Sequence, residues 1–396
     1  MESATIAKVK LQNKLKISFY AILAGIFSGL SAWAFLVSLQ FCTKYRVAHP
    51  NVVFGLPLAG LMIGLIYHYF GKEIQPGTSL ILDEIQTPKK VTPFRMGPAI
   101  FLTTLLTHLF GGSAGREGTV VQMGASFADQ LSRYFKINPE QRRILLVAGM
   151  GAGFGSALGA PWAGIFFGIE VVRQLPNTLF PIIECTLASF VAFGVTLILH
   201  APHTEFPQVV THFSTETILY VLIASLLFAA IARSFLFVEH RIESYFKKRV
   251  KHSAFKPFVG GIFLLLLFKL GHLDNFEGLG LDTIQISFHE QLPASVFLLK
   301  LLLTALTLGC GFKGGEFIPL IFMGATAGSF LSSMTHLPLS FLPALGTVGV
   351  FAAASKTPLT CSIMAVELFG WEIAPYALVT CILSSALSGR TTIYKK

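Results

Sequence analysis

The chain of 396 residues is 53% hydrophobic and 13% charged, and soluble domains usually carry about 25% charged residues. This composition excludes an ordinary soluble enzyme or binding domain and predicts a polytopic membrane protein. The net charge of +10 comes from short basic clusters beside apolar runs. Such clusters are typical of topology signals, so nucleic acid is not expected as a partner.

Apolar runs that could form membrane helices recur along the whole chain. A helix needs roughly 20 apolar residues to cross a bilayer, and several runs are shorter or are interrupted by Gly and Pro. Interrupted helices survive at membrane depth only where protein or a polar cavity takes up their backbone hydrogen bonds. They therefore favour a transporter or channel. In chain order the runs are 17–41, 52–69, 97–110, 143–170, 178–199, 218–238, 257–268, 295–308, 317–333, 340–354 and 374–387.

The basic clusters predict the orientation of the chain in the membrane. The first cluster, within 8–16, precedes run 17–41, so we expect a cytoplasmic N-terminus. That run is too long for a signal-peptide core, and no small-residue cleavage site follows it. Further clusters lie within 133–143, 247–251 and 395–396. The last of these favours a cytoplasmic C-terminus as well.

Metal and cofactor signatures are missing from the sequence. The five cysteines are scattered, with no C-x-x-C pair, and they are interpreted as small packing residues. No H-E-x-x-H or comparable cluster occurs. We therefore expect no metal and no cofactor.

The chain repeats itself. GMGAGFGSALGAPWAGIFFGIE at 149–170 aligns with GTVGVFAAASKTPLTCSIMAVE at 346–367, and GREGTVVQMGAS at 115–126 aligns with GEFIPLIFMGAT at 315–326. Two apolar halves with matching breaks predict a transporter with a midplane site. We expect one transport domain, with repeats at about 17–200 and 215–394. The residues alone leave open whether the halves are parallel or inverted.

Each half has a Gly-rich turn that leads directly into a helix. The first N–H groups of a helix are unpaired and carry partial positive charge, so such a terminus is a ready anion site. Two of them could hold an anion without a full buried charge. A full charge would bind the ion too tightly for rapid passage.

These segments resemble the CLC family of chloride channels and proton-coupled anion antiporters, over about 17–394. GREGT (115–119) resembles the family's G-K/R-E-G-P turn, and GGEFIP (314–319) resembles its G-x-F-x-P turn. PGTSL (76–80) stands less faithfully for its G-S-G-I-P turn, and Tyr394 matches its pore tyrosine. The resemblance implies an all-helical membrane fold of two inverted halves with re-entrant helices. It also implies a homodimer in the cell (inner) membrane.

The resemblance assigns roles to residues in these turns. Glu117 becomes the gate: its carboxylate mimics the anion when deprotonated and leaves when protonated, which links protons to anion movement. An acid at a helix start is also an ordinary cap, but intramembrane acids are costly and usually functional. The implied anion ligands are Thr78 (or Ser79 if the register slips), Arg116 and Gly118, Glu316, Phe317 and Ile318, and Tyr394.

Several residues depart from the family pattern. Thr119 replaces a proline, and GREGT with FKGGE is similar to the bacterial branch that contains fluoride exporters. Thr78 keeps a hydroxyl and Phe317 keeps the chloride-type turn. We therefore expect chloride first and fluoride second.

The inner proton path is a second departure. After Glu170, Val171 stands where proton-coupled chloride members have an inner glutamate. This favours a channel without proton coupling, an antiporter with another inner route, or the fluoride branch. Glu184 is a spare intramembrane acid, interpreted as a packing residue. Glu316 would repel the anion unless its side chain turns away, for example toward Lys313.

The end of the sequence also differs from the family. Only Lys395 and Lys396 follow Tyr394. We therefore expect neither a long last helix nor cytoplasmic nucleotide-binding modules.

Two other functions stand as alternatives. GASF (124–127) is similar to the context of membrane serine proteases, but no histidine has an obvious pairing with Ser126. The second half has Thr326 at the matching place, and packing of small residues explains both. We therefore expect no enzyme activity. A transporter for a larger anion, such as a carboxylate, stays open.

Overall fold

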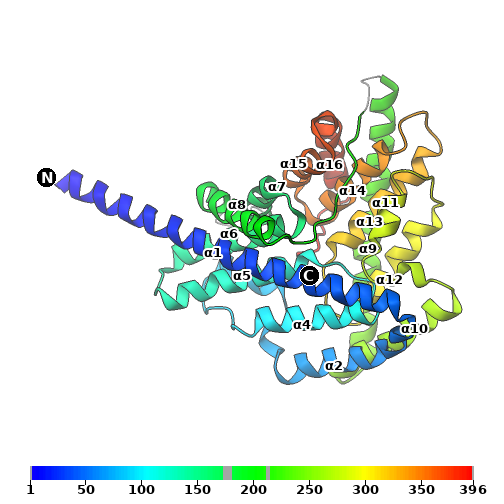
Figure 1. Cartoon of the computed structure of the whole chain (residues 1–396), viewed down its shortest axis with the longest axis horizontal. Helices are drawn as coiled ribbons and strands as arrows, with labels where there is room; N and C mark the ends of the chain where they lie inside the picture. The colour runs from blue at the N-terminus through cyan, green and yellow to red at the C-terminus, as the bar shows by residue number, and fades with distance from the viewer. Residues whose placement is uncertain (1, 173–180, 211–214, 395–396) are drawn as a thin grey trace. The chain divides into compact units, whose positions relative to one another are not determined.

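The computed structural model describes residues 2–172, 181–210 and 215–394, and these form helices joined by short turns (Figure 1). Lys395, Lys396 and the first residues of run 178–199 lie outside the described residues. Within the described part the only extended pairing is an isolated bridge between Gly115 and Gly315. The predicted all-helical fold is confirmed.

The helices follow one another in this order: α1 (Glu2–Ala48), α2 (Leu56–Tyr69), α3 (Thr78–Gln86), α4 (Met96–Leu109), α5 (Glu117–Tyr134), α6 (Pro139–Leu158), α7 (Pro161–Val172), α8 (Ile182–Ile198), α9 (Thr215–Arg249), α10 (Lys256–Leu270), α11 (Leu281–Ile286), α12 (Ser295–Gly309), α13 (Phe317–Ser332), α14 (Phe341–Ser355), α15 (Pro358–Phe369) and α16 (Ala374–Leu387). Short 3₁₀ turns lie at Pro50–Gly55, Lys72–Ile74, Ser253–Phe255, Asp274–Phe276 and Trp371–Ile373.

Every predicted apolar run coincides with helix. Run 143–170 forms two helices, because Gly159 ends α6 in the left-handed conformation and Pro161 starts α7. Four helices, α3, α5, α11 and α15, lie outside the runs. They are short or carry polar residues, so an apolar-run criterion does not find them.

Among the described residues, four helical segments are long and apolar enough to cross a membrane by length and composition: Gln12–Ala48, Pro50–Tyr69, Glu216–Arg249 and Ser253–Leu270. Eight shorter apolar helices of 10 to 17 residues accompany them. Short apolar helices cannot span alone, so their ends must be satisfied inside the protein. This is the broken-helix pattern expected from the sequence.

The internal repeat is visible in the order of the elements. The first copies of the repeated segments lie on α5, α6 and α7, and the second copies lie on α13, α14 and α15. The match extends to backbone conformation. Gly159 ends α6 with φ 76° and Lys356 ends α14 with φ 61°, and each is followed two residues later by the proline that opens the next helix.

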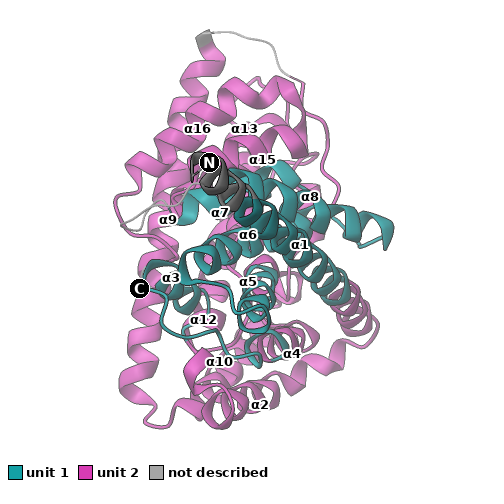
Figure 2. Ribbon diagram, turned by 90° about the vertical axis from the view of Figure 1, so that its left-hand side faces the viewer, with its two compact units in different colours: residues 1–36, 76–98, 120–203 teal, residues 37–75, 99–119, 204–396 magenta. Residues whose placement is uncertain are grey.

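The chain forms two compact units that interleave along the sequence (Figure 2). Unit 1 comprises residues 1–36, 76–98 and 120–203, and unit 2 comprises 37–75, 99–119 and 204–396. In unit 1, α6 packs against α7 and α8; in unit 2, α14 packs against α9, α13 and α16.

A buried ionic cluster fixes the end of α3 inside unit 1. The guanidinium of Arg142 donates from Nε to Asp129 Oδ1 at 2.6 Å and from NH1 to Glu84 Oε2 at 2.9 Å. Asp129 Oδ2 also accepts from the Thr92 N–H at 2.7 Å. Because these charges are buried, each depends on the others for its hydrogen bonds. The cluster therefore holds the helix that begins at Thr78.

Candidate anion site

Two turns from distant parts of the sequence are joined inside unit 2. The N–H of Gly115 donates to the carbonyl of Gly315 at 2.6 Å, and the N–H of Gly315 donates to the carbonyl of Gly115 at 2.8 Å. Helix α5 begins two residues after Gly115, and α13 begins two residues after Gly315. The two helix N-termini that the sequence selected are therefore tied together through their preceding turns.

The joined turns leave no room for side chains at the two glycines. A Cβ on Gly315 would lie 2.8 Å from the Gly118 nitrogen, and a Cβ on Gly115 would lie 2.8 Å from the Gly315 oxygen. Contacts this short are essentially absent from proteins. Glycine at these two positions therefore lets the start of α5 and the turn before α13 approach each other closely.

Glu117 is folded back onto the start of its own helix. Its Oε1 is 3.1 Å from Arg116 Nε, and its Oε2 accepts from the Arg116 backbone N–H at 3.3 Å. Both side chains are buried, with 1% of Glu117 and 5% of Arg116 exposed. Arg116 NH2 also donates to Thr204 Oγ1 at 3.1 Å. A carboxyl oxygen thus occupies a helix N-terminus, where a small anion would also be stabilised.

His108 supports the turn that precedes α5. Its Nε2 donates to the Gly115 carbonyl at 3.2 Å, and its own carbonyl accepts from Arg46 NH1 at 2.7 Å. Arg46 Nε also lies 3.7 Å from Glu277 Oε2. No role was predicted for His108 from the sequence. Its supporting role was missed because it depends on Arg46, which is distant in sequence.

Lys300 holds the loop that contains Phe276 and Gly278 beside the same turn. Its ammonium group donates to the carbonyls of Phe276 at 3.2 Å and Gly278 at 2.8 Å, and lies 5.0 Å from the centre of the Phe322 ring. The Gly278 N–H in turn donates to the Gly111 carbonyl at 3.2 Å. One sequence signal could have found this residue: Lys300 is a charge in the middle of run 295–308.

Glu277 is the titratable group of this loop. Burial raises its pKa to about 7, against the opposing charges of Arg46 and Lys269. The nearby Asp274 shows the reverse shift, because its hydrogen bond from Lys269 lowers the pKa of Asp274. A carboxyl group that changes charge near neutral pH therefore lies beside Arg46.

The second turn leads into a closely packed helix start. Glu316 is the N-cap residue of α13, and Phe317 and Ile318 are buried. The Phe317 ring meets Phe351 edge-on, with centroids 4.5 Å apart. Lys313 lies 4.2 Å from the centre of the Tyr67 ring and 3.4 Å from the Gln75 carbonyl.

Tyr394 lies near this second turn. Its phenol is within range of an electrostatic interaction with Glu316. The preceding residues are held to the end of α14: Ile393 N–H donates to Ala354 at 3.0 Å, and Thr392 Oγ1 donates to Ser355 at 3.2 Å. The segment that ends at Tyr394 is thus held against the end of α14.

Thr78 and Ser79 belong to unit 1, whereas the other predicted ligands belong to unit 2. Both lie at the start of α3 and are partly exposed. Gly77 precedes them with φ 61°, and the Ser79 N–H donates to the Pro76 carbonyl at 3.3 Å. The pair thus occupies the N-terminus of α3.

Three further residues bear on the enzyme alternative and on the inner proton path. Ser126 is fully buried on α5, and no described residue hydrogen-bonds to its hydroxyl. Val171 is buried on α7, where the inner glutamate would stand. Glu184 lies in the first turn of α8 and is partly exposed.

Comparison with known proteins agrees with this arrangement. The chain is 41% identical over 384 residues to a chloride/fluoride channel protein of Pseudomonas syringae pv. tomato, covering 94% of this chain and 83% of that one. The crystal structure of a CLC-type fluoride/proton antiporter matches with a TM-score of 0.92 and 28% identity, covering 96% of this chain and 97% of that one.

A slow cyanobacterial Cl⁻/H⁺ antiporter shares the fold, with a TM-score of 0.84 and 19% identity over 96% of each chain. The family model for voltage gated chloride channels matches residues 59–389. This match covers most of the chain, including both turns. The chain therefore belongs to the voltage-gated chloride channel (CLC) family of integral membrane transporters.

Proposed function

We propose that this protein exchanges a halide ion for protons across the membrane, with Glu117 as the group where the two ions meet. The observation that carries this proposal is the buried carboxylate of Glu117 at the N-terminus of α5, beside the paired Gly115 and Gly315 turns. An acid in that place competes with an anion for the same N–H groups. The Glu117 side chain therefore leaves this position only when its carboxyl group is protonated.

The exchange cycle follows from this competition. With Glu117 deprotonated, its carboxylate occupies the anion position and is stabilised by Arg116. A proton bound to the carboxylate removes the charge, the side chain turns out, and a halide takes its place. The halide would then be held by Thr78 or Ser79, by the N–H groups around Arg116, Gly118, Glu316, Phe317 and Ile318, and by the hydroxyl of Tyr394.

Fluoride is the ion we would test first, although the sequence alone favoured chloride. The relative at 41% identity carries both ions in its name, and the solved relative at 28% identity is a fluoride/proton antiporter. Chloride is the second candidate, because Thr78 offers a hydroxyl and Phe317 keeps the chloride-type turn. A channel without proton coupling is the third.

Family membership also supports an assembly and an orientation. We propose a homodimer with one pore in each subunit, in the cell (inner) membrane. The basic cluster that precedes the apolar part of α1 places the N-terminus in the cytoplasm under the positive-inside rule. Lys395 and Lys396 argue for the same side at the other end.

A paired flux assay tests the proposal. The purified protein is placed in liposomes, and a halide electrode and a pH electrode are read together, first in fluoride and then in chloride. Proton movement opposite in direction to the halide flux is expected with at least one ion. Halide flux without any proton movement would overturn the exchange proposal and leave a channel. No flux of either halide would overturn the assignment of substrate.

A further inference from the structure

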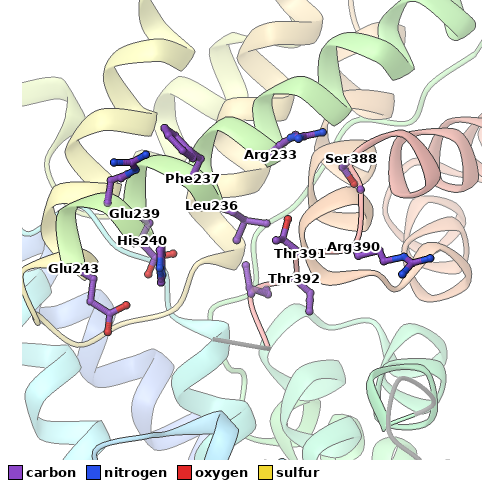
Figure 3. Close-up of a pocket in the computed structure, with 13 residues that line it drawn as sticks. Arg233, Leu236, Phe237, Glu239, His240, Glu243, Ser388, Arg390, Thr391 and Thr392 are labelled. Atoms are coloured by element: carbon purple, nitrogen blue, oxygen red, sulfur yellow. The ribbon is translucent and has the colours of Figure 1, made fainter. Parts of the chain in front are cut away.

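A cavity of about 520 Å³ lies beside the last turns of α9 in unit 2 (Figure 3). One wall is α9 itself, and the facing wall is the segment that follows α16. Since a water molecule in the liquid takes roughly 30 Å³, the cavity can hold on the order of ten waters. Its lining residues are Arg233, Leu236, Phe237, Glu239, His240, Arg241, Glu243 and residues 388–393.

Glu239 is the buried acid in this lining. It is only 4% exposed, although it lies on a helix apolar enough to cross a membrane. A buried carboxylate is costly unless it is paired, hydrogen-bonded or protonated. The cycle proposed above does not use Glu239, which lines the cavity.

Charge around the rim shows that the cavity opens to water rather than to lipid. Arg233, His240, Arg241 and Arg390 line it and are exposed, and hydrocarbon would not tolerate such a group of side chains. The last turn of the same helix carries Lys247, Lys248 and Arg249. Glu239 precedes Arg249 by ten residues, or about 15 Å of helix. Basic clusters mark cytoplasmic ends, so the cavity faces the cytoplasm.

The cavity also adjoins the proposed anion path. Thr392 and Ile393 line it, and Tyr394 is the next residue. On the other side of Glu239, α9 lies tightly against the end of α12: a Cβ on Gly309 would lie 3.1 Å from the Glu239 carbonyl. Helix α12 leads into the second turn, which contains Glu316. Glu239 thus lies between cytoplasmic water and the segments that carry two predicted anion ligands.

We propose that Glu239 is the inner proton-transfer residue of this transporter, in place of the glutamate that is absent at Val171. This inference rests on the proposed exchange function. The Glu239 carboxylate takes a proton from a hydronium ion in the cavity and leaves water behind. It then gives that proton to water leading toward Glu117, and the sequence runs in reverse when the exchange reverses.

The charges near Glu239 allow such a role. Figure 3 shows Glu239, His240 and Glu243 at one end of the cavity, with Arg233 and Arg390 toward the other. Arg241 lies 5.0 Å from the centre of the Phe237 ring. The charged residues on the elements packed against α9 are Lys300 on α12, Glu316 before α13 and Lys356 after α14. Basic groups therefore accompany Glu239 along the cavity, with His240 and Arg241 directly after it in the sequence.

The test measures the ratio of proton flux to halide flux in liposomes for Glu239→Gln, Glu239→Asp and Glu243→Gln. Glu239→Gln should keep halide flux while its proton-to-halide ratio falls at least about tenfold, because a proton-transfer group is worth that much or more. Glu239→Asp keeps a titratable carboxyl and should restore most of the ratio. Glu243→Gln, on the same wall and one turn away, is the matched control and should keep the wild-type ratio.

The outcomes separate the two proposals. An unchanged ratio in Glu239→Gln, or equal losses of both fluxes, would overturn the role of Glu239 while wild-type exchange still stands. An equal fall of the ratio in Glu243→Gln would also overturn it, since the effect would then come from the loss of any negative charge in the cavity and not from Glu239 itself. If the wild-type protein itself moves no protons, the exchange function fails first.

Discussion

Gly115 and Gly315, 200 residues apart in the sequence, exchange two backbone hydrogen bonds and so join the turns that open α5 and α13. Each turn fixes the other, because a shift of either backbone would break both bonds. Both N–H groups are spent on this pairing. The groups left for an anion are therefore those further into each helix, from residue 116 and residue 316 onward.

We predict that Gly315→Ala abolishes most transport. The added Cβ would lie 2.8 Å from the Gly118 nitrogen, and overpacking of this kind costs about 1–3 kcal/mol. Halide flux should fall about tenfold or more, since 1.4 kcal/mol corresponds to a factor of ten. Gly194→Ala is the control, because a Cβ there meets nothing within 4 Å. Wild-type flux in Gly315→Ala would show that the close approach of the turns is unnecessary.

Replacement of Glu117 should separate the two ion fluxes. Neither Glu117→Gln nor Glu117→Ala can bind and release a proton, so we expect proton transport to vanish while halide flux continues. The paired electrodes in liposomes measure both. Unchanged proton movement in Glu117→Ala would refute the assignment of the gate.

Thr78→Val should weaken halide binding. The substitution keeps the shape of the side chain and removes its hydroxyl, and one hydrogen bond is worth about 0.5–1.5 kcal/mol. Calorimetric titration of the purified protein with halide measures the change. Ser79→Ala is the comparison, because it identifies which of the two hydroxyls contacts the ion. If both variants bind like the wild type, neither hydroxyl is a ligand.

Arg142→Ala should destabilise the fold far more than loss of an exposed arginine. It leaves Asp129 and Glu84 buried without their partner, and breaking a buried pair in this way costs about 3–5 kcal/mol. Thermal unfolding in detergent should show a clear drop in Tm. Arg133→Ala is the matched control, since Arg133 is exposed at the end of α5. Equal Tm values for the two variants would contradict the anchoring role of the cluster.

The pKa of Glu277 predicts a pH dependence of stability. Burial raises it from an ordinary 4.5 to about 7, so between these values the folded chain holds a proton that the unfolded chain has released. Stability should therefore fall as pH rises from about 4.5 to about 7 and level off above. Glu277→Gln should flatten the Tm profile over that range, and Glu372→Gln, at an exposed site, should not. A wild-type-like slope in Glu277→Gln would assign it to other groups.

Much of the fold could be predicted from the sequence, because two signals act at short range. Apolar runs located most helices, and the repeated GREGT and GGEFIP segments located the helix starts that carry Glu117 and Phe317. Helix α11 was missed, since six residues carry too little periodicity to stand out. Helix α3 was indicated only by the PGTSL turn that opens it.

The support around the turns could not be predicted, because it depends on distant partners. His108 is one of eleven histidines, and nothing in its neighbours indicates that Arg46 and Gly115 will meet it. Glu239 is likewise ordinary in a row of charges until the segment 388–393 closes a cavity over it. A charged residue inside an apolar run, such as Lys300, is the one local signal that would have pointed to the residues that support the turns.

The left-handed residues that end α6 and α14 give the two halves unequal stiffness. Gly159 has no side chain to restrain it, so the bend between α6 and α7 can act as a hinge. Lys356 holds the same backbone shape, but its ammonium group is fastened to the Ser385 carbonyl and the Ser388 hydroxyl near the end of α16. The left-handed residue itself is thus held by its side chain in the second half, whereas the first joint is held by its neighbours, with Ser189 Oγ donating to the Pro161 carbonyl at 2.8 Å and His203 Nε2 donating to the Ser156 carbonyl at 2.9 Å. Movements during a transport cycle should be sought at the glycine joint, and the half that contains Lys356 should serve as the fixed frame.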